Sequence, residues 1–156
     1  MAKDQDHPNI SPMVHPPIVA LMFIVIAYFL GRFVPLAFAP EILRYIGLVL
    51  TFVGFLLGIG AFLEFRKART TLDPHGSAKQ LVTSGIYRFT RNPIYLGFLL
   101  MVIGIPLNSG LYWGIVLAPF YVLLMHRLII QHEEAYLERK FGKAYTGYAS
   151  RVRRWL

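Results

Sequence analysis

Apolar residues in this sequence gather in four long runs, separated by two short turns and one long polar connection. The runs cover residues 16–39, 42–65, 93–107 and 111–130. Three of them reach the ~20 residues that an α-helix needs to cross a bilayer, and the third run is shorter. The pattern predicts an all-α integral membrane protein with about four transmembrane helices. The polar connection, residues 64–92, is long enough to be functional.

The last two apolar runs are expected to form a helical hairpin. Asn92 is a suitable N-cap and Pro93 suits the first helical position, so the third helix should begin there. The sequence Asn-Ser-Gly at residues 108–110 predicts a tight turn after it. The fourth run then returns the chain after Ile130 to the membrane face on which Arg91 lies. In the second run, Gly54 and Gly58 have a spacing that indicates close helix packing.

The C-terminal segment has the pattern of an amphipathic helix. Apolar residues recur every three or four positions, which is one face of an α-helix: Leu137, Phe141, Tyr145, Tyr148, Val152 and Trp155. Lys and Arg fill the other faces, whereas Gly142 and Gly147 weaken an unbroken helix. We expect this segment to lie on the cytoplasmic membrane surface.

We interpret residues 1–156 as a single domain. Residues 1–15 form a polar N-terminal tail, residues 16–65 the first two membrane helices, and residues 66–156 a catalytic core. The polar start does not fit a cleavable signal peptide, and the first apolar run is too long for one. It is therefore expected to be retained as a membrane helix.

Composition and charge support a membrane protein. Of the 156 residues, 56% are hydrophobic and 15% charged, with a net charge of +8. The basic residues flank apolar runs, which fits the positive-inside rule and contact with anionic lipid better than nucleic-acid binding. They concentrate in the long connection and in the C-terminal tail, so both are expected to face the cytoplasm.

Several kinds of catalytic site are excluded or disfavoured. The chain has no cysteine, which excludes disulfides, thiolate catalysis and cysteine metal sites. The sequence His-Glu-Glu at residues 132–134 lacks metal-ligand spacing, so no metal is expected. Neither a dinucleotide-binding glycine motif nor a nucleophile elbow occurs.

The polar groups near the two cytoplasmic segments leave alternatives open. Glu133 and Glu134 are either a solvated pair or partners of a cation, with Arg91 or a cationic ligand as candidates. Negative charge is disfavoured at a helix C-terminus, unless the fourth helix continues into the tail. Tyr87 and Tyr95 flank Arg91 and are either interfacial aromatics or rings that pack on a ligand.

Two motifs give the chain a family resemblance. "LVTSGIYRFTRNPIYLG" at residues 81–97 and "EEAYLERKFGKAYTGYASRVRRW" at residues 133–155 resemble the isoprenylcysteine carboxyl methyltransferase and phospholipid methyltransferase superfamily. The resemblance implies an integral membrane enzyme that uses S-adenosylmethionine and releases S-adenosylhomocysteine. Its bacterial-type members imply a bacterial inner membrane, with the cofactor site facing the cytoplasm.

The resemblance also implies roles for individual residues. The residues that it implies bind the cofactor are His75, Lys79, Gln80, Leu81, Val82, Tyr87, Asn92, Pro93, Ile94, Tyr95 and Glu133. Arg91 and Glu134 are the expected catalytic residues. A carboxylate can bind the ammonium of the cofactor, and either Arg91 or backbone N–H groups at the N-terminus of the third run can hold its carboxylate.

The sequence departs from the isoprenylcysteine enzymes at two positions. Asn92 stands where those enzymes usually have His. Ile129 stands where they have an arginine linked to the acceptor, and Arg127 is out of register by two. The resemblance therefore supports the cofactor more than the acceptor.

The expected function is methyl transfer from S-adenosylmethionine to a lipophilic acceptor that enters from the bilayer. Carboxyl O-methylation of isoprenylcysteine type is the leading hypothesis. The alternatives are N-methylation of an ethanolamine phospholipid and a non-catalytic membrane scaffold.

Overall fold

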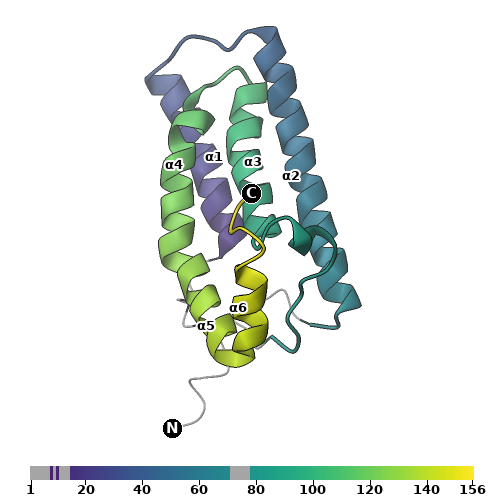
Figure 1. Ribbon diagram of the computed structural model, residues 1–156. Helices are drawn as coiled ribbons and strands as arrows, with labels where there is room; N and C mark the ends of the chain where they lie inside the picture. Colours follow the sequence, from purple (N-terminus) through teal and green to yellow (C-terminus); the bar gives the residue numbers. More distant parts are fainter. Residues whose placement is uncertain (1–7, 9, 11–14, 71–77) are drawn as a thin grey trace. The chain divides into compact units, whose positions relative to one another are not determined.

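A computed structural model describes residues 8, 10, 15–70 and 78–156 of the chain. Helices account for its main elements (Figure 1). In chain order they are α1 (Pro16–Phe33), α2 (Glu41–Lys67), the 3₁₀ helix η2 (Gly85–Arg88), α3 (Pro93–Asn108), α4 (Trp113–Met125), the π-helix η3 (His126–Ile130), α5 (Gln131–Phe141) and α6 (Lys143–Ala149).

The chain divides into two compact units. Residues 15–57 and 94–125 form one, here named the apolar unit, and the described residues within 1–14, 58–93 and 126–156 form the other, here named the polar unit. Each unit is built from segments far apart in sequence, since α2 and the continuous helix that starts with α4 each contribute to both.

In the apolar unit, α1 packs along α4 (Figure 1). The ring of Phe23 on α1 meets the buried ring of Tyr121 on α4 edge-on, with their centroids 5.5 Å apart. At the other end of α1, the indole N–H of Trp113 donates to the carbonyl of Val34 at 2.9 Å. Aromatic contact and this hydrogen bond together fix the first helix on the fourth.

Glycines bring α2 and α3 into backbone contact. A Cβ atom at Gly54 would lie 2.5 Å from the carbonyl oxygen of Gly97, and one at Gly104 would lie 2.6 Å from that of Gly47. On each helix the two glycines are seven positions apart, and the two contacts pair them in antiparallel order. Gly58, in contrast, has nothing within 4 Å of its would-be Cβ. Helix packing was expected here, but the partner of Gly54 is Gly97, and Gly58 takes no part.

The expected membrane architecture is confirmed. In the part of the chain that the structure describes, three helices are long and apolar enough to cross a membrane, over Pro16–Phe33, Glu41–Lys67 and Trp113–Phe141, and Pro93–Asn108 is a shorter apolar helix. The hairpin between α3 and α4 is also present: Gly110 turns the chain with φ +86°, and Gly114 packs against the Val102 carbonyl.

The fourth helix is longer than the apolar run that predicts it. Instead of covering residues 111–130, helical structure begins at Trp113 and continues through η3 and α5 to Phe141. No glycine or proline occurs between Pro119 and Gly142, so nothing in the sequence stops the helix where its apolar character ends. Glu133 therefore lies within a continuous helix, and not at the C-terminus of the fourth helix, which was the other possibility.

The C-terminal segment differs from a single surface helix. Gly142, with φ +50°, ends α5, and the short helix α6 follows it. Tyr145 and Tyr148 on α6 are buried, and their partners belong to the polar unit itself. The face that these two rings share therefore packs on protein and not on lipid.

Candidate functional site

The site begins with a turn that a buried carboxylate holds. Glu64, near the end of α2, accepts a hydrogen bond from the Ser84 hydroxyl at 2.6 Å and one from the Lys67 ammonium at 2.7 Å. Gly85 follows with φ +57°, and a Cβ there would lie 2.5 Å from the Glu64 carboxyl carbon. Only glycine suits both the left-handed backbone and the close carboxylate. The turn leads directly into η2, which carries Tyr87.

Tyr87 is buried at the centre of the polar unit. Its ring meets that of Phe65 edge-on at 5.6 Å, and its carbonyl accepts a hydrogen bond from the Tyr148 hydroxyl at 2.7 Å. Burial raises the pKa of the Tyr87 phenol, and the negative charge of Glu133 raises it further. The Tyr87 phenol therefore stays protonated and can donate a hydrogen bond, and the negative charge of Glu133 acts on it. Glu133 also takes part in a polar interaction.

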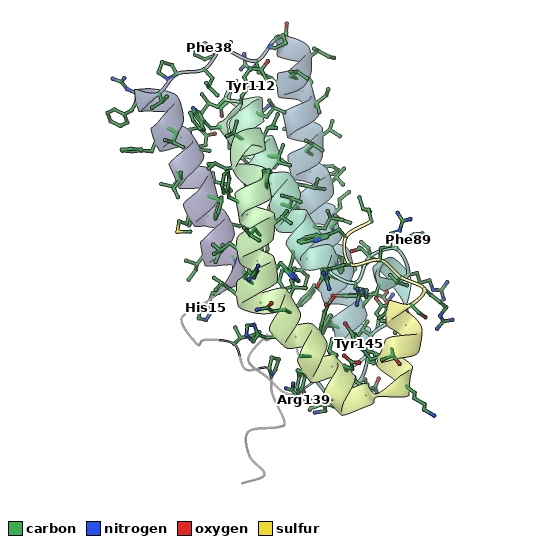
Figure 2. The ribbon with its side chains drawn as sticks, turned by 60° about the vertical axis from the view of Figure 1, so that its left-hand side comes forward. His15, Phe38, Phe89, Tyr112, Arg139 and Tyr145 are labelled. Carbon is green, nitrogen blue, oxygen red and sulfur yellow. The ribbon has the colours of Figure 1, made fainter. Side chains whose placement is uncertain are left out.

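The Arg-Asn-Pro motif connects η2 to α3. The Arg91 guanidinium lies 3.1 Å from a Glu134 oxygen and donates to the Tyr145 hydroxyl at 3.1 Å. The side-chain amide of Asn92 donates to the Arg154 carbonyl at 3.0 Å. Figure 2 shows Tyr145 on α6, so the hydrogen bond from Arg91 joins the motif to this helix. The sequence offered Arg91 as the cationic partner of the carboxylate pair, and the structure confirms that pairing for Glu134.

Glu134 has a second arginine. The Arg154 guanidinium forms a two-pronged contact with it, at 2.9 Å from Nε to one carboxylate oxygen and 2.6 Å from Nη2 to the other. Both oxygens of Glu134 thus accept from guanidinium groups, and its side chain is only 18% exposed. Charge-assisted, two-pronged contacts of this kind are among the strongest hydrogen bonds in proteins.

The segment from Lys79 to Val82, which is expected to bind the cofactor, is anchored at two points. The backbone N–H of Ala78 donates to the Tyr136 hydroxyl at 2.9 Å, and that of Lys79 donates to the Thr70 hydroxyl at 3.0 Å. Val82 is buried, Leu81 is half-buried, and the side chains of Lys79 and Gln80 are exposed.

The expected site residues fall into three groups. The polar unit holds Lys79, Gln80, Leu81, Val82, Tyr87, Arg91, Asn92, Pro93, Glu133 and Glu134. Ile94 and the buried Tyr95 belong to the apolar unit. His75 lies outside the described residues. Within the described part of the chain, no group of three or more His, Cys, Asp or Glu side chains could hold a metal ion.

The structure adds residues that the sequence analysis did not single out. Arg154 counted there only as a tail charge, and Glu64 only as the start of a polar connection. Tyr145 and Tyr148 were assigned to a membrane-facing stripe. Their helical spacing was the available signal for burial, but it does not say which surface buries them.

Comparisons with known proteins converge on one family. A family model described as phospholipid methyltransferase matches residues 43–144. Protein-S-isoprenylcysteine O-methyltransferase B of Arabidopsis thaliana is 35% identical over 78 residues, which are 47% of this chain and 37% of that protein. The chain therefore spans little more than a third of that protein's length.

Two further relatives show how widely the shared region is used. An uncharacterized protein of Haemophilus influenzae is 38% identical over 66 residues, which are 40% of this chain and 100% of that protein. The Delta(14)-sterol reductase TM7SF2 of Mus musculus is 34% identical over 83 residues, which are 51% of this chain and 19% of that protein. The similar region thus also occurs in a protein that is named a reductase and not a methyltransferase.

Proposed function

Because this chain belongs to the phospholipid methyltransferase family, we propose that it transfers a methyl group from S-adenosylmethionine to a lipophilic acceptor. The acceptor that we propose is a carboxylate of isoprenylcysteine type, and the released product is S-adenosylhomocysteine. The observation that carries the proposal is the ion pair between Arg91 of the Arg-Asn-Pro motif and Glu134 of the Glu133–Glu134 pair in the polar unit.

The donor set of the polar unit fits this cofactor. The Nε atom of Arg91 is buried and, among the described residues, has no hydrogen-bond partner, so it can donate to a carboxylate. Glu133 supplies negative charge beside a buried phenol, a setting that suits an ammonium. When bound, S-adenosylmethionine supplies an electrophilic methyl group on a sulfonium.

The chain's own residues then have two tasks, orientation and exclusion of water. Arg91, held by Glu134 and Tyr145, presents a guanidinium of fixed direction. Tyr87 and Val82 are buried and line the interior with rings and methyl groups. Methyl transfer is an in-line displacement, for which alignment and a dry site contribute more than a strong acid or base. We retain Lys79, Gln80, Leu81, Val82 and Asn92–Tyr95 as proposed cofactor contacts.

The environment of Glu134 favours a carboxylate acceptor over an amine. A carboxylate is already ionised at neutral pH, whereas an ammonium must lose a proton before it can be methylated. Both oxygens of Glu134 already accept hydrogen bonds from Arg154, and one of them is also paired with Arg91, which leaves this carboxylate poorly placed to take that proton. We therefore assign Glu134 the task of orienting Arg91.

One observation favours a second candidate, N-methylation of an ethanolamine phospholipid. The Nδ1 atom of His132 is buried and has no partner within the described residues. A neutral imidazole nitrogen of this kind can act as a base toward an ammonium. The two candidates differ in the acceptor and share the cofactor.

Titration of S-adenosylhomocysteine into the protein in lipid nanodiscs tests the cofactor. We expect saturable binding at one site, and no binding of a nicotinamide reductant, which serves as the control because one relative is named a reductase. The reverse result would overturn the proposed methyltransferase. Transfer of a labelled methyl group to a prenylcysteine analogue, against phosphatidylethanolamine in the same nanodiscs, then decides between O- and N-methylation.

Glu133→Gln should weaken S-adenosylhomocysteine binding by about tenfold or more, because a hydrogen bond to a charged group contributes roughly 1.5–3 kcal/mol. The matched control is Glu138→Gln, which removes one negative charge from an exposed position on the same helix. Equal affinities of the two variants would remove Glu133 from the proposed cofactor site.

A further inference from the structure

The C-terminal segment is bound closely to the Arg-Asn-Pro motif. The carbonyl of Arg154 accepts hydrogen bonds from the Asn92 amide at 3.0 Å and from the Thr90 hydroxyl at 3.2 Å. The neighbouring carbonyl of Arg153 accepts the backbone N–H of Arg91 at 3.0 Å. Two backbone carbonyls of the tail thus accept hydrogen bonds from three consecutive residues, Thr90, Arg91 and Asn92.

The side chain of Arg154 adds an ionic contact to the backbone ones. Its guanidinium holds both oxygens of Glu134, and Glu134 in turn holds the guanidinium of Arg91. The order of contacts is therefore Arg154, Glu134, Arg91. Glu134 lies between two cations, and its attraction to Arg154 raises the pKa of that guanidinium above its ordinary value.

Without Arg154, the same carboxylate would have a different geometry. Glu134 would keep Arg91 as its one arginine, but nothing would fix the rotation of the carboxylate plane, since the two-pronged contact comes from Arg154 alone. The Asn92 amide would also lose its acceptor if the tail moved away. Both motif side chains would then sample other rotamers.

We propose that Arg154 is a positioning residue of the cofactor site, which acts through Glu134 on Arg91 and through its carbonyl on Asn92. The inference rests on the proposed function, since the site that Arg154 orders is the proposed S-adenosylmethionine site. Arg154 itself does not contact the cofactor. We name the Arg154 side chain and the backbone carbonyls of residues 153 and 154 the latch; the exposed side chain of Arg153 is no part of it.

The first test measures the latch without any ligand. The chain has no cysteine, so Leu156→Cys gives a single attachment point for a nitroxide label beside the latch, at a residue that is 73% exposed. In the otherwise unchanged protein we expect a restricted label, and in Arg154→Ala a mobile one. Arg153→Ala is the matched control, because it removes an equal charge from an exposed neighbour and keeps the carbonyl.

The second test measures affinity for S-adenosylhomocysteine in nanodiscs. Arg154→Ala should weaken binding about tenfold, the effect of one charge-assisted contact, while Arg153→Ala should leave it unchanged. Arg154→Lys keeps the charge but loses the planar fork, so its affinity should fall between the two. If Arg154 had a purely structural role, its variants would lose thermal stability, but their affinities for S-adenosylhomocysteine would not follow the order wild type, Arg154→Lys, Arg154→Ala.

The outcomes separate the latch from the proposed function. A label that stays restricted in Arg154→Ala overturns the latch, whatever the ligand does. If the wild type binds S-adenosylhomocysteine and Arg154→Ala binds it with the same affinity, the positioning role is wrong. If the wild type does not bind the ligand, the proposed function fails, and the label alone decides whether Arg154 holds the tail.

Discussion

Gly85 illustrates how one missing side chain sets the geometry of the site. Gly85→Ala would combine left-handed strain, roughly 1–2 kcal/mol per residue, with a clash against the Glu64 carboxylate. We expect the free energy of unfolding to fall by more than the strain alone. Thermal unfolding in detergent, followed by circular dichroism, measures the loss.

Two other glycines of the polar unit serve as controls for Gly85. Gly142 also has a positive φ, +50°, but nothing lies within 4 Å of its would-be Cβ, so Gly142→Ala should show the strain alone. Gly147 lies in α6 with open space around it, so Gly147→Ala should stabilise the helix by about 0.5–1 kcal/mol. Equal losses at Gly85 and Gly142 would show that the Glu64 contact costs nothing.

Buried phenols should make the protein sensitive to high pH. Burial is the first cause that raises the pKa values of Tyr87 and Tyr148 above the ordinary value of about 10. Above that pH the unfolded chain releases protons that the folded protein keeps, so the free energy of unfolding should decrease as pH rises. Below about pH 9 these groups should give no pH dependence.

Tyr148→Phe tests this pH dependence in melting curves. The variant loses the hydrogen bond to the Tyr87 carbonyl, which should cost about 1 kcal/mol near neutral pH. It also loses one phenol with a raised pKa, so its stability should fall less steeply above pH ~10 than that of the wild type. An unchanged slope would mean that Tyr148 ionises normally in the folded protein.

At the scale of elements, the glycine contacts between α2 and α3 predict a sharp contrast. Gly54→Ala and Gly97→Ala each place a methyl group against a backbone carbonyl, so each should cost about 1–3 kcal/mol, the usual effect of overpacking. Gly58→Ala, on the same helix as Gly54, should be neutral or stabilising. Resistance to unfolding in mixed detergent micelles measures all three, and equal behaviour of Gly54→Ala and Gly58→Ala would contradict the contact.

Helix starts and stops were predictable where the sequence carries a local signal. Pro93 begins α3 as expected, and Gly142 breaks the C-terminal helix as its backbone freedom suggests. The end of the fourth helix was not predictable from hydropathy. Hydropathy reports where the lipid ends, near Ile130, whereas the backbone continues helical to Phe141.

The candidate site was predictable only in its local part. The motif around Arg91 and its carboxylate partner Glu134 could be proposed from sequence, because a hairpin returns one to the other. Arg154 and Glu64 were not, since their contacts depend on tertiary packing across 62 and 20 positions, and single charges near a membrane also report topology.

At the scale of the whole molecule, the long helix α2 predicts opposite sidedness for its two ends. Its 27 residues extend about 40 Å at 1.5 Å per residue, more than the hydrocarbon core. Phe38 precedes this helix, in a turn that Figure 2 shows near Tyr112, and Gln80 follows it. We propose that the Gln80 side is cytoplasmic and the Phe38 side faces out.

Single cysteines in the cysteine-free chain test this topology. In intact bacterial cells, an impermeant maleimide should label Phe38→Cys, at a side chain that is 80% exposed, and should leave Gln80→Cys unlabelled. After the inner membrane is opened, both should react. Labelling of Gln80→Cys in intact cells would reverse the orientation, and labelling of both would argue against a spanning α2.

The short length of α3 has a consequence for the surrounding lipid. None of residues 94–108 is exposed, and the 16 residues of α3 extend only about 24 Å, against a hydrocarbon thickness of about 30 Å. The rest of the protein covers the side chains of this short helix, which by its length alone does not reach across the hydrocarbon core. We therefore expect methyl transfer to the proposed lipid-borne acceptor to depend on acyl chain length, with higher activity in thinner bilayers than in thicker ones.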